Sequence, residues 1–238
     1  MNLLILHPED FVDDEHAIIR DRRHQHIVSV HRGAAGDTLK AGLLNGNAGT
    51  AEILETGADT TRLRVVLTDA PVAALPLRLI MAMPRPKMFR RCLQHITAMG
   101  VKDIVLINAV RVEKSFWQTP WLEPDNLREQ MLLGLEQAVD TQLPQIRIEK
   151  RFKPFVEDDL SEFAAGTRKL VAHPVTDTPC PVDMAEPATL AVGPEGGFIP
   201  YEVEKLQEQG FEVVHLGKRI LRVETAIPVL ISRLFPSR

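Results

Sequence analysis

The sequence predicts an α/β protein in which a small β-rich segment precedes a longer layer of alternating strands and helices. Short apolar runs separated by Gly, Asn and Asp turn signals fill about the first seventy residues. Beyond them, strand-like apolar runs alternate with stretches of helical spacing, which is typical of a mostly parallel sheet covered by helices. We therefore expect two domains, residues 1–71 and 72–238.

The β-rich segment is expected to form a compact barrel or sandwich. A helix is suggested only around DEHAIIRDRR, residues 14–23. The expected strands are NLLIL, HIVSVHR, DTLKAGLL, GTAEIL and RLRVVLTD, at residues 2–6, 26–32, 37–44, 49–54 and 62–69.

The second segment has clear helix signals. Phe89, Cys92, Leu93 and Ile96 recur at helical spacing before Gly100, and a second helix is expected over residues 127–138. Pro200 and Gly210 bound a third helix, and a last one follows Arg222. The expected strands lie at residues 77–83, 103–107, 146–148, 169–173, 189–192 and 211–216.

Composition and missing motifs exclude several classes of protein. No apolar run is long enough to span a bilayer, and the two cysteines look like buried small hydrophobes, so we expect a cytoplasmic protein. GxxxxGK[ST], GxGxxG and GxSxG are all absent. HQH at residues 24–26 has no partner at zinc spacing, so we expect partly exposed histidines on a strand and no metal.

The charge balance does not exclude nucleic acid. The formal net charge is −4, from 28 basic and 32 acidic residues, but binding depends on local patches. Two basic strips, residues 20–32 and 84–91, are candidate nucleic-acid contacts, although such strips are also common as solvated faces.

The run AVGPEGGFIP, residues 191–200, joins a strand to a helix and carries Glu195 among glycines. Ligands of parallel sheets lie at the carboxyl ends of the strands, and glycines let a ligand approach the backbone closely. Glu195 disfavours a di- or triphosphate there. A neutral or cationic ligand such as S-adenosylmethionine suits the loop better; the alternative is a tight turn with an exposed acid.

A second strand-to-helix loop, LGKRILRVETAIP, covers residues 216–228. Its Arg219 and Arg222 bracket two aliphatic residues, whereas Glu224 and Thr225 are also suited to capping the following helix. Both loops follow strands of one parallel sheet, so we expect them to lie along the same edge.

GPEGGF followed by LGKRILRVETA resembles the ribosomal RNA uridine N3-methyltransferases, the RsmE type of the SPOUT superfamily. HIVSVHRGAAGDTL, PKMFRRCLQHITAMGVKDI, LEQA and AHP extend the resemblance over nearly the whole chain. It implies a PUA-like β-barrel followed by an α/β SPOUT methyltransferase domain whose end forms a trefoil knot. It also implies a homodimer that binds S-adenosyl-L-methionine and acts on 16S rRNA of the small ribosomal subunit.

The resemblance also implies roles for particular residues. Arg222 would stabilise the developing uridine anion, and Glu195 or Glu224 would orient Arg222 or accept the proton. The implied RNA contacts are Arg22, Arg23, Arg32, Lys87 and Arg90. The implied cofactor pocket consists of Val171, Ala172, His173, Val192, Gly193, Pro194, Glu195, Gly196, Gly197, Leu216, Gly217, Arg219, Ile220, Leu221 and Thr225.

Two stretches depart from the family pattern: Asp140 lies where a Gly-Arg type segment is common, and the aromatic-rich loop at residues 109–123 replaces the family's acid-arginine pair after the strand at 103–107. Its Phe116, Trp117 and Trp121 either stack on RNA bases or pack on the sheet. The alternative functions are a sister SPOUT methyltransferase for another RNA site, an RNA-binding member without catalysis, and a metabolic α/β enzyme.

Overall fold

The computed structural model describes residues 2–236. The chain divides into two compact units. The first combines the residues up to Ala73 with Leu132–Leu143, and the second combines Ala74–Met131 with the residues from Pro144 onward. Among the described residues, no helix has the length and apolar character needed to cross a membrane.

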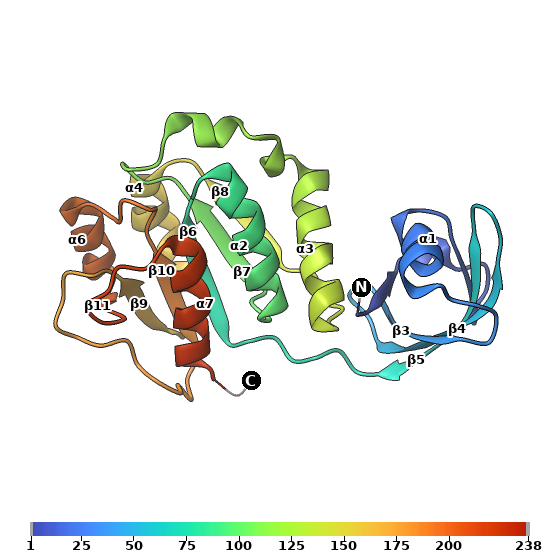
Figure 1. The fold of residues 1–238 in the computed structure, drawn as a ribbon. Coiled ribbons are helices and arrows are strands. Elements are labelled where there is room, and N and C mark those ends of the chain that lie inside the picture. Colours follow the sequence, from blue (N-terminus) through green and yellow to red (C-terminus); the bar gives the residue numbers. More distant parts are fainter. Residues whose placement is uncertain (1, 237–238) are drawn as a thin grey trace. The chain divides into compact units, whose positions relative to one another are not determined.

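The first unit is built on a five-stranded sheet in the order β1-β3-β4-β5-β2 (Figure 1). β1 pairs parallel with β3, and the other pairs are antiparallel. Alternate residues of the strands point inward to a core that includes Leu6, Ile19, Ile53 and Leu63. The elements are β1 (Leu4–Leu6), η1 (Pro8–Asp10), β2 (His16–Ile19), α1 (Arg22–His26), η2 (Ile27–His31), β3 (Thr38–Leu43), β4 (Ala48–Thr56) and β5 (Thr61–Asp69).

Two predictions for this unit are wrong, because strand and helix are exchanged. Residues 26–31 of the predicted strand at 26–32 belong to the helical run α1–η2, and the suggested helix at 14–23 contains strand β2. Asp21 caps α1 by accepting a hydrogen bond from the Arg23 backbone N–H at 2.8 Å. The alternating valines of HIVSVH misled the prediction, since Val28 and Val30 are exposed and only Ile27 is buried in η2.

Residues 132–143 pack with the first unit, which the sequence did not lead us to expect. Leu132 and Leu135 bury their side chains against Leu3 and Ile5. The departure at Asp140 belongs to this region: its side chain is buried and its Oδ1 accepts a hydrogen bond from the Gln142 N–H at 2.9 Å. Asp140 therefore contributes to the local structure of this segment.

The second unit is an α/β layer on a six-stranded, wholly parallel sheet in the order β11-β9-β10-β6-β7-β8. The predicted parallel sheet is confirmed, with each expected strand and helix present. The elements are β6 (Leu77–Ala82), α2 (Pro86–Ala98), β7 (Asp103–Ile107), η3 (Lys114–Gln118), η4 (Pro120–Leu122), α3 (Pro124–Ala138), β8 (Gln145–Glu149), α4 (Phe152–Pro154), η5 (Phe155–Asp159), α5 (Leu160–Phe163), β9 (Arg168–Ala172), β10 (Ala188–Val192), α6 (Pro200–Glu208), β11 (Glu212–Val214) and α7 (Val223–Leu234).

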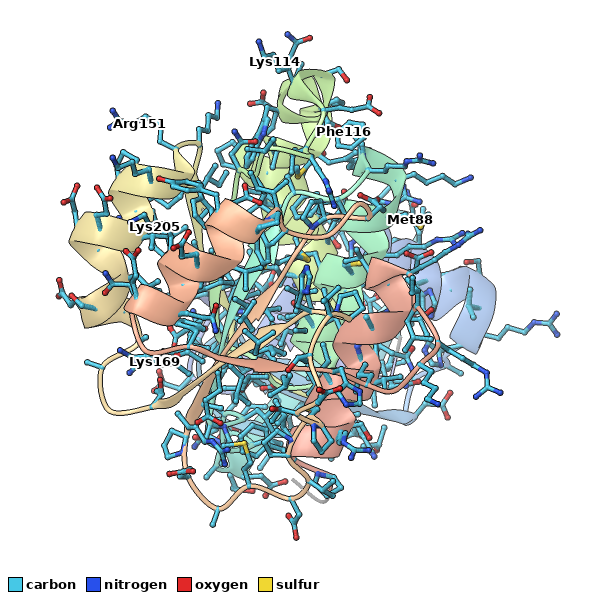
Figure 2. The ribbon with its side chains drawn as sticks, turned by 90° about the vertical axis from the view of Figure 1, so that its left-hand side faces the viewer. Met88, Lys114, Phe116, Arg151, Lys169 and Lys205 are labelled. Carbon is cyan, nitrogen blue, oxygen red and sulfur yellow. The ribbon has the colours of Figure 1, made fainter. Side chains whose placement is uncertain are left out.

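Helices cover both faces of this sheet. α2 and α7 lie side by side on one face, and α4 and α6 lie on the other (Figures 1 and 2). β10 lies between β9 and β6 and is buried throughout, which explains why all its residues except Thr189 are apolar. The carboxyl ends of β6, β7, β9, β10 and β11 therefore bring their loops to one edge of the sheet.

Candidate functional site

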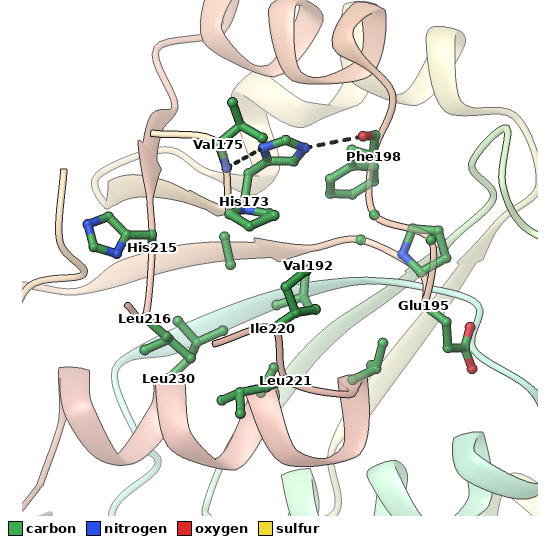
Figure 3. Close-up of a pocket in the computed structure, with 18 of the residues that line it drawn as sticks. His173, Val175, Val192, Glu195, Phe198, His215, Leu216, Ile220, Leu221 and Leu230 are labelled. Atoms are coloured by element: carbon green, nitrogen blue, oxygen red, sulfur yellow. Dashed lines mark hydrogen bonds between the residues drawn. The ribbon is translucent and has the colours of Figure 1, made fainter. Parts of the chain in front are cut away.

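An apolar cavity of about 420 Å³ lies at the carboxyl edge of the parallel sheet. Three loops form its walls: the residues after β9, the glycine loop (residues 193–199) after β10, and the residues after β11. Figure 3 shows His173 and Phe198 on one side of this cavity and Leu216, Ile220 and Leu221 facing them. Backbone groups and aliphatic side chains dominate the walls, as is usual for a small-molecule site.

Two hydrogen bonds fix the orientation of His173. Its Nδ1 accepts from the Val175 backbone N–H at 3.2 Å, so the ring proton is on Nε2, which donates to the Phe198 carbonyl at 3.3 Å (Figure 3). The imidazole thereby joins the loop after β9 to the glycine loop.

The glycine loop requires its glycines for conformational reasons. Gly197 has φ +73°, and a Cβ built there would meet no atom within 4 Å. A side chain at this position would therefore be strained by the backbone and would project into open space beside the cavity. Gly193 is confined instead, because its Cβ would lie 2.8 Å from the Phe198 nitrogen.

A second cavity of about 460 Å³, lined mainly by charged residues, adjoins the glycine loop. Glu195 lines both cavities, and its Oε1 accepts a hydrogen bond from the Arg85 backbone N–H at 2.9 Å. Arg222 and Glu224 also line the second cavity, with Arg222 Nη1 at 4.0 Å from Glu224 Oε1. The remaining lining residues are Arg85, Lys87 and Met88.

The two cavities bring together most of the residues predicted from sequence. Arg222, Glu195 and Glu224, the predicted catalytic residues, share the second cavity with Lys87. Val171 is buried within β9 and Thr225 lies in the first turn of α7, so neither lines the first cavity. The other predicted pocket residues do line it: Ala172, His173, Val192, Gly193, Pro194, Glu195, Gly196, Gly197, Leu216, Gly217, Arg219, Ile220 and Leu221.

Sequence reasoning missed Arg85 and Arg111 as lining residues. Arg85 follows β6 and Arg111 follows β7, and neither lies in a glycine motif. Each comes shortly after a predicted parallel strand, whose carboxyl end faces the site, and Arg85 also belongs to the basic strip at residues 84–91.

The proposed RNA contacts of the first unit need one correction. Arg23 has a side chain only 5% exposed and pairs with Asp10 at 2.6 Å and with Asp21 at 2.8 Å. It is therefore a buried structural residue and unsuited to contact RNA. Arg22 and Arg32 are both exposed, but Arg22 pairs with the buried carboxylate of Glu136 at 2.6 Å.

The aromatic loop packs within the second unit. Trp117 Nε1 donates a hydrogen bond to Asn108 Oδ1 at 2.9 Å, and the Arg90 guanidinium lies 4.8 Å from the Trp121 ring centroid. Both indoles are half-buried. Trp121 thus places Arg90, another predicted RNA contact, by a cation–π interaction.

His24 also differs from its prediction. It is buried in α1, with Nδ1 2.8 Å from Thr61 Oγ1 and Nε2 3.1 Å from the Ala58 carbonyl oxygen. The described residues contain no group of three or more His, Cys, Asp or Glu side chains arranged to hold a metal.

Neither cysteine offers a nucleophile. Burial raises the pKa of the Cys92 thiol to about 12, and the negative charges of Glu224 and Glu195 add to this effect. Burial likewise raises the pKa of Cys180 to about 11. Because the thiolate is the reactive form, covalent thiol chemistry is not supported at this site.

The fold and site together define a ligand-binding α/β protein whose apolar pocket adjoins a second one that is lined mainly by charged residues. A family model described as an RNA methyltransferase domain matches residues 71–235. The chain belongs to this family of RNA methyltransferases, which excludes the metabolic α/β enzyme considered above.

Individual relatives agree with this assignment. The chain is 29% identical over 232 residues to a protein of Treponema pallidum named ribosomal RNA small subunit methyltransferase E, covering 95% of this chain and 87% of that one. A ribosomal RNA small subunit methyltransferase E from Neisseria gonorrhoeae, solved bound to S-adenosyl methionine, has a similar fold, with a TM-score of 0.77 and 22% identity. That match covers 98% of this chain and 95% of the other.

Proposed function

We propose that the protein transfers a methyl group from S-adenosylmethionine to N3 of a specific uridine in 16S rRNA of the small ribosomal subunit. The observation that carries the proposal is the junction of the two cavities at Glu195. One cavity is apolar and bordered by backbone, and the other carries Arg85, Lys87 and Arg222 beside two carboxylates. The names of the relatives support the substrate class.

The first cavity fits the cofactor in size and chemistry. Its volume of about 420 Å³ lies within the usual range for small-molecule sites. The loops after β9, β10 and β11 offer backbone hydrogen-bonding groups to an adenosine, and the carboxylate of Glu195 in the glycine loop disfavours a phosphate-bearing ligand. When bound, S-adenosylmethionine supplies an electrophilic methyl group on a positively charged sulfur.

The residues of the second cavity would prepare the uridine for attack. N3 carries a weakly acidic proton, which must leave before its electron pair can form the new bond to carbon. Glu195 is placed to accept this proton, because it lines both cavities and Arg85 holds its carboxylate. Arg222 would stabilise the charge that develops on the base, with Glu224 orienting it.

The finer features of the fold are part of the same proposal. We propose that the first unit is a PUA-like RNA-binding domain and that the chain end forms a trefoil knot. Two backbone hydrogen bonds support the knot: the Cys180 N–H donates to the His215 carbonyl, and the Met184 N–H donates to the Leu234 carbonyl. The loop between β9 and β10 therefore contacts both the segment after β11 and the end of α7. Exposed apolar residues Ile220 and Val229, near and on α7, support a homodimer. Action on ribosomal subunits would place the protein in the cytoplasm.

The test is to map methylated uridines by mass spectrometry in 16S rRNA from cells with and without the gene. We expect one N3-methyluridine to disappear on deletion and to return when purified protein and S-adenosylmethionine are added to the unmethylated subunits. A methyl group missing from another RNA site would favour a sister enzyme. RNA binding with no missing methyl group would favour a member without catalysis.

A further inference from the structure

Glu202 is a buried carboxylate that the proposed mechanism does not use. It lies in the first turn of α6, and its residue exposure is 1%. Its Oε2 accepts a hydrogen bond from the Ile199 backbone N–H at 2.9 Å, and its Oε1 accepts one from the Val110 backbone N–H at 2.7 Å. The two donors belong to different loops, one at the end of the glycine loop and one after β7.

A carboxylate removed from water is destabilising unless hydrogen bonds satisfy its oxygens. To cap α6, Glu202 needs only the hydrogen bond to Ile199, the residue just before the helix. The bond to Val110 spans 92 positions in the sequence and ties the glycine loop to the segment after β7. Glu202 therefore acts as a cross-link between two loops at the edge of the sheet.

Arg111, the next residue after Val110, makes a second attachment to the same loop. Its Nη1 donates a hydrogen bond to the Gly196 carbonyl oxygen. Its aliphatic stem also packs on the loop, since a Cβ built at Gly196 would lie 3.0 Å from Arg111 Cδ. Two consecutive residues thus hold the glycine loop at two points, Gly196 and Ile199.

We propose that Glu202 and Arg111 are positioning residues that hold the glycine loop in its binding conformation and so set the affinity of the first cavity for its cofactor. This rests on the proposed function for the identity of the cofactor. A loop that is already held in place loses less conformational freedom when a ligand binds, which strengthens binding. Both attachments begin at residues 110 and 111, within the segment at 109–123.

The experiment compares Glu202→Gln, Arg111→Ala and Arg111→Lys with the unchanged protein. Glutamine keeps one acceptor oxygen but turns an amide N–H₂ toward the other backbone donor, so one of two hydrogen bonds is removed. Arg78→Ala is the matched control, because Arg78 also donates to backbone carbonyls, those of Phe163 at 2.6 Å and Ala165 at 3.0 Å. Calorimetry with S-adenosylmethionine, steady-state kinetics and hydrogen exchange of the glycine-loop amides are measured on each folded variant.

We expect Glu202→Gln and Arg111→Ala to raise the dissociation constant and the KM for S-adenosylmethionine about tenfold, the usual effect of removing one charged hydrogen bond. The kcat at saturating cofactor should stay within about twofold, because neither residue is proposed to act on the uridine. Arg111→Lys retains a charged donor and should recover most of the affinity. Arg78→Ala should bind as the unchanged protein does.

Hydrogen exchange separates this inference from the proposed function. The amides of the glycine loop should exchange at least several-fold faster in Glu202→Gln and Arg111→Ala without any ligand present. If the unchanged protein does not bind S-adenosylmethionine but exchange still rises, the proposed function fails and the attachment of the loop stands. Unchanged exchange in both variants, or unchanged affinity despite faster exchange, would overturn the inference.

Discussion

Arg222 has a side chain 86% exposed and lies one residue before α7, within the second cavity. Because it does not line the cofactor cavity, its contribution should appear in turnover only. We expect Arg222→Ala to lower the single-turnover rate roughly a hundredfold or more, as removal of one charge that stabilises a transition state does. Cofactor affinity, measured by calorimetry, should remain within a small factor.

Arg147→Ala is a suitable control for this prediction. Arg147 is also an exposed arginine of the second unit, paired with Glu149 and Asp159, but it lies on β8, away from both cavities. Its removal should leave the rate unchanged. A near-normal rate for Arg222→Ala would remove Arg222 from the catalytic role.

A substitution at Gly197 tests whether the glycine loop binds the cofactor. We expect Gly197→Ala to weaken S-adenosylmethionine binding by tenfold or more, because the new Cβ projects beside the cavity from a backbone with φ +73°. Gly166→Ala is a close match, since Gly166 has φ +72° and equally open space around its Cβ. Both variants should lose similar stability in thermal unfolding, and only Gly197→Ala should lose affinity in calorimetry. Equal affinity in the two variants would count against the assigned cavity.

At the scale of elements, helix α1 depends on the buried guanidinium of Arg23. Arg23 pairs with Asp10 and Asp21 and donates to the Ile5 carbonyl at 2.7 Å. Replacing it with Met would leave Asp10 buried without its partner. We expect Arg23→Met to reduce the free energy of unfolding by about 3–5 kcal/mol, whereas Arg64→Met, which removes an exposed pair with Glu52, should cost at most about 1 kcal/mol.

The pairing of Asp21 with Arg23 also predicts that the free energy of unfolding decreases at acid pH. Burial alone would raise the pKa of Asp21, but the hydrogen bonds and charge of Arg23 outweigh it and hold the pKa below its usual value of 3.8. The resulting stability is present above about pH 4 and disappears as the pH falls through the lower pKa of the folded protein. Denaturant titrations from pH 6 to pH 3 should show this decrease for the unchanged protein and a smaller one for Arg23→Met. Parallel curves would contradict the assignment.

At the scale of the whole molecule, RNA binding should depend on exposed cations of the first unit. Arg20 and Arg32 are exposed, so they replace Arg23 as residues to test. We expect Arg20→Glu with Arg32→Glu to weaken binding to small subunits and to flatten the dependence of log affinity on log salt. The slope should change by about one for each phosphate that the variant no longer neutralises. Cofactor affinity should not change.

Lys150→Glu with Lys153→Glu changes the total charge equally and serves as the control, since both lysines are exposed and lie at the start of α4. The control should retain the full salt dependence. If the Arg20 and Arg32 variant methylates subunits at the normal rate in low and high salt alike, the first unit is not the RNA-binding surface.

The proposed dimer is tested by measuring the mass of the purified protein in solution. We expect light scattering at micromolar concentration to give about twice the chain mass of 26.6 kDa. Val229→Glu places a charge on an α7 residue that is 41% exposed and should shift the mass toward the monomer without unfolding it. A monomer mass for the unchanged protein would contradict the proposal.

The sequence by itself determined the parallel sheet and the two loops at its edge. Strands β6 and β10 are almost wholly buried, so each is a mostly apolar run with a single polar residue, Arg78 in β6 and Thr189 in β10. Helix α2 shows its buried side at helical spacing. The glycine loop and the residues before α7 could also be identified from the sequence, because their conformation and chemistry depend on their own glycine and charged residues.

Only the tertiary structure decided the remaining features, because each depends on contacts between residues far apart in sequence. Burial of Ile27, with Val28 and Val30 left exposed, accompanies a helical run where alternation predicted a strand. Packing of Leu132 and Leu135 on Leu3 and Ile5 assigned residues 132–143 to the first unit. The strand order β10-β6-β7 brought the segments after β6 and β7 against the glycine loop, and a strand order is set by pairing energies that no single segment contains.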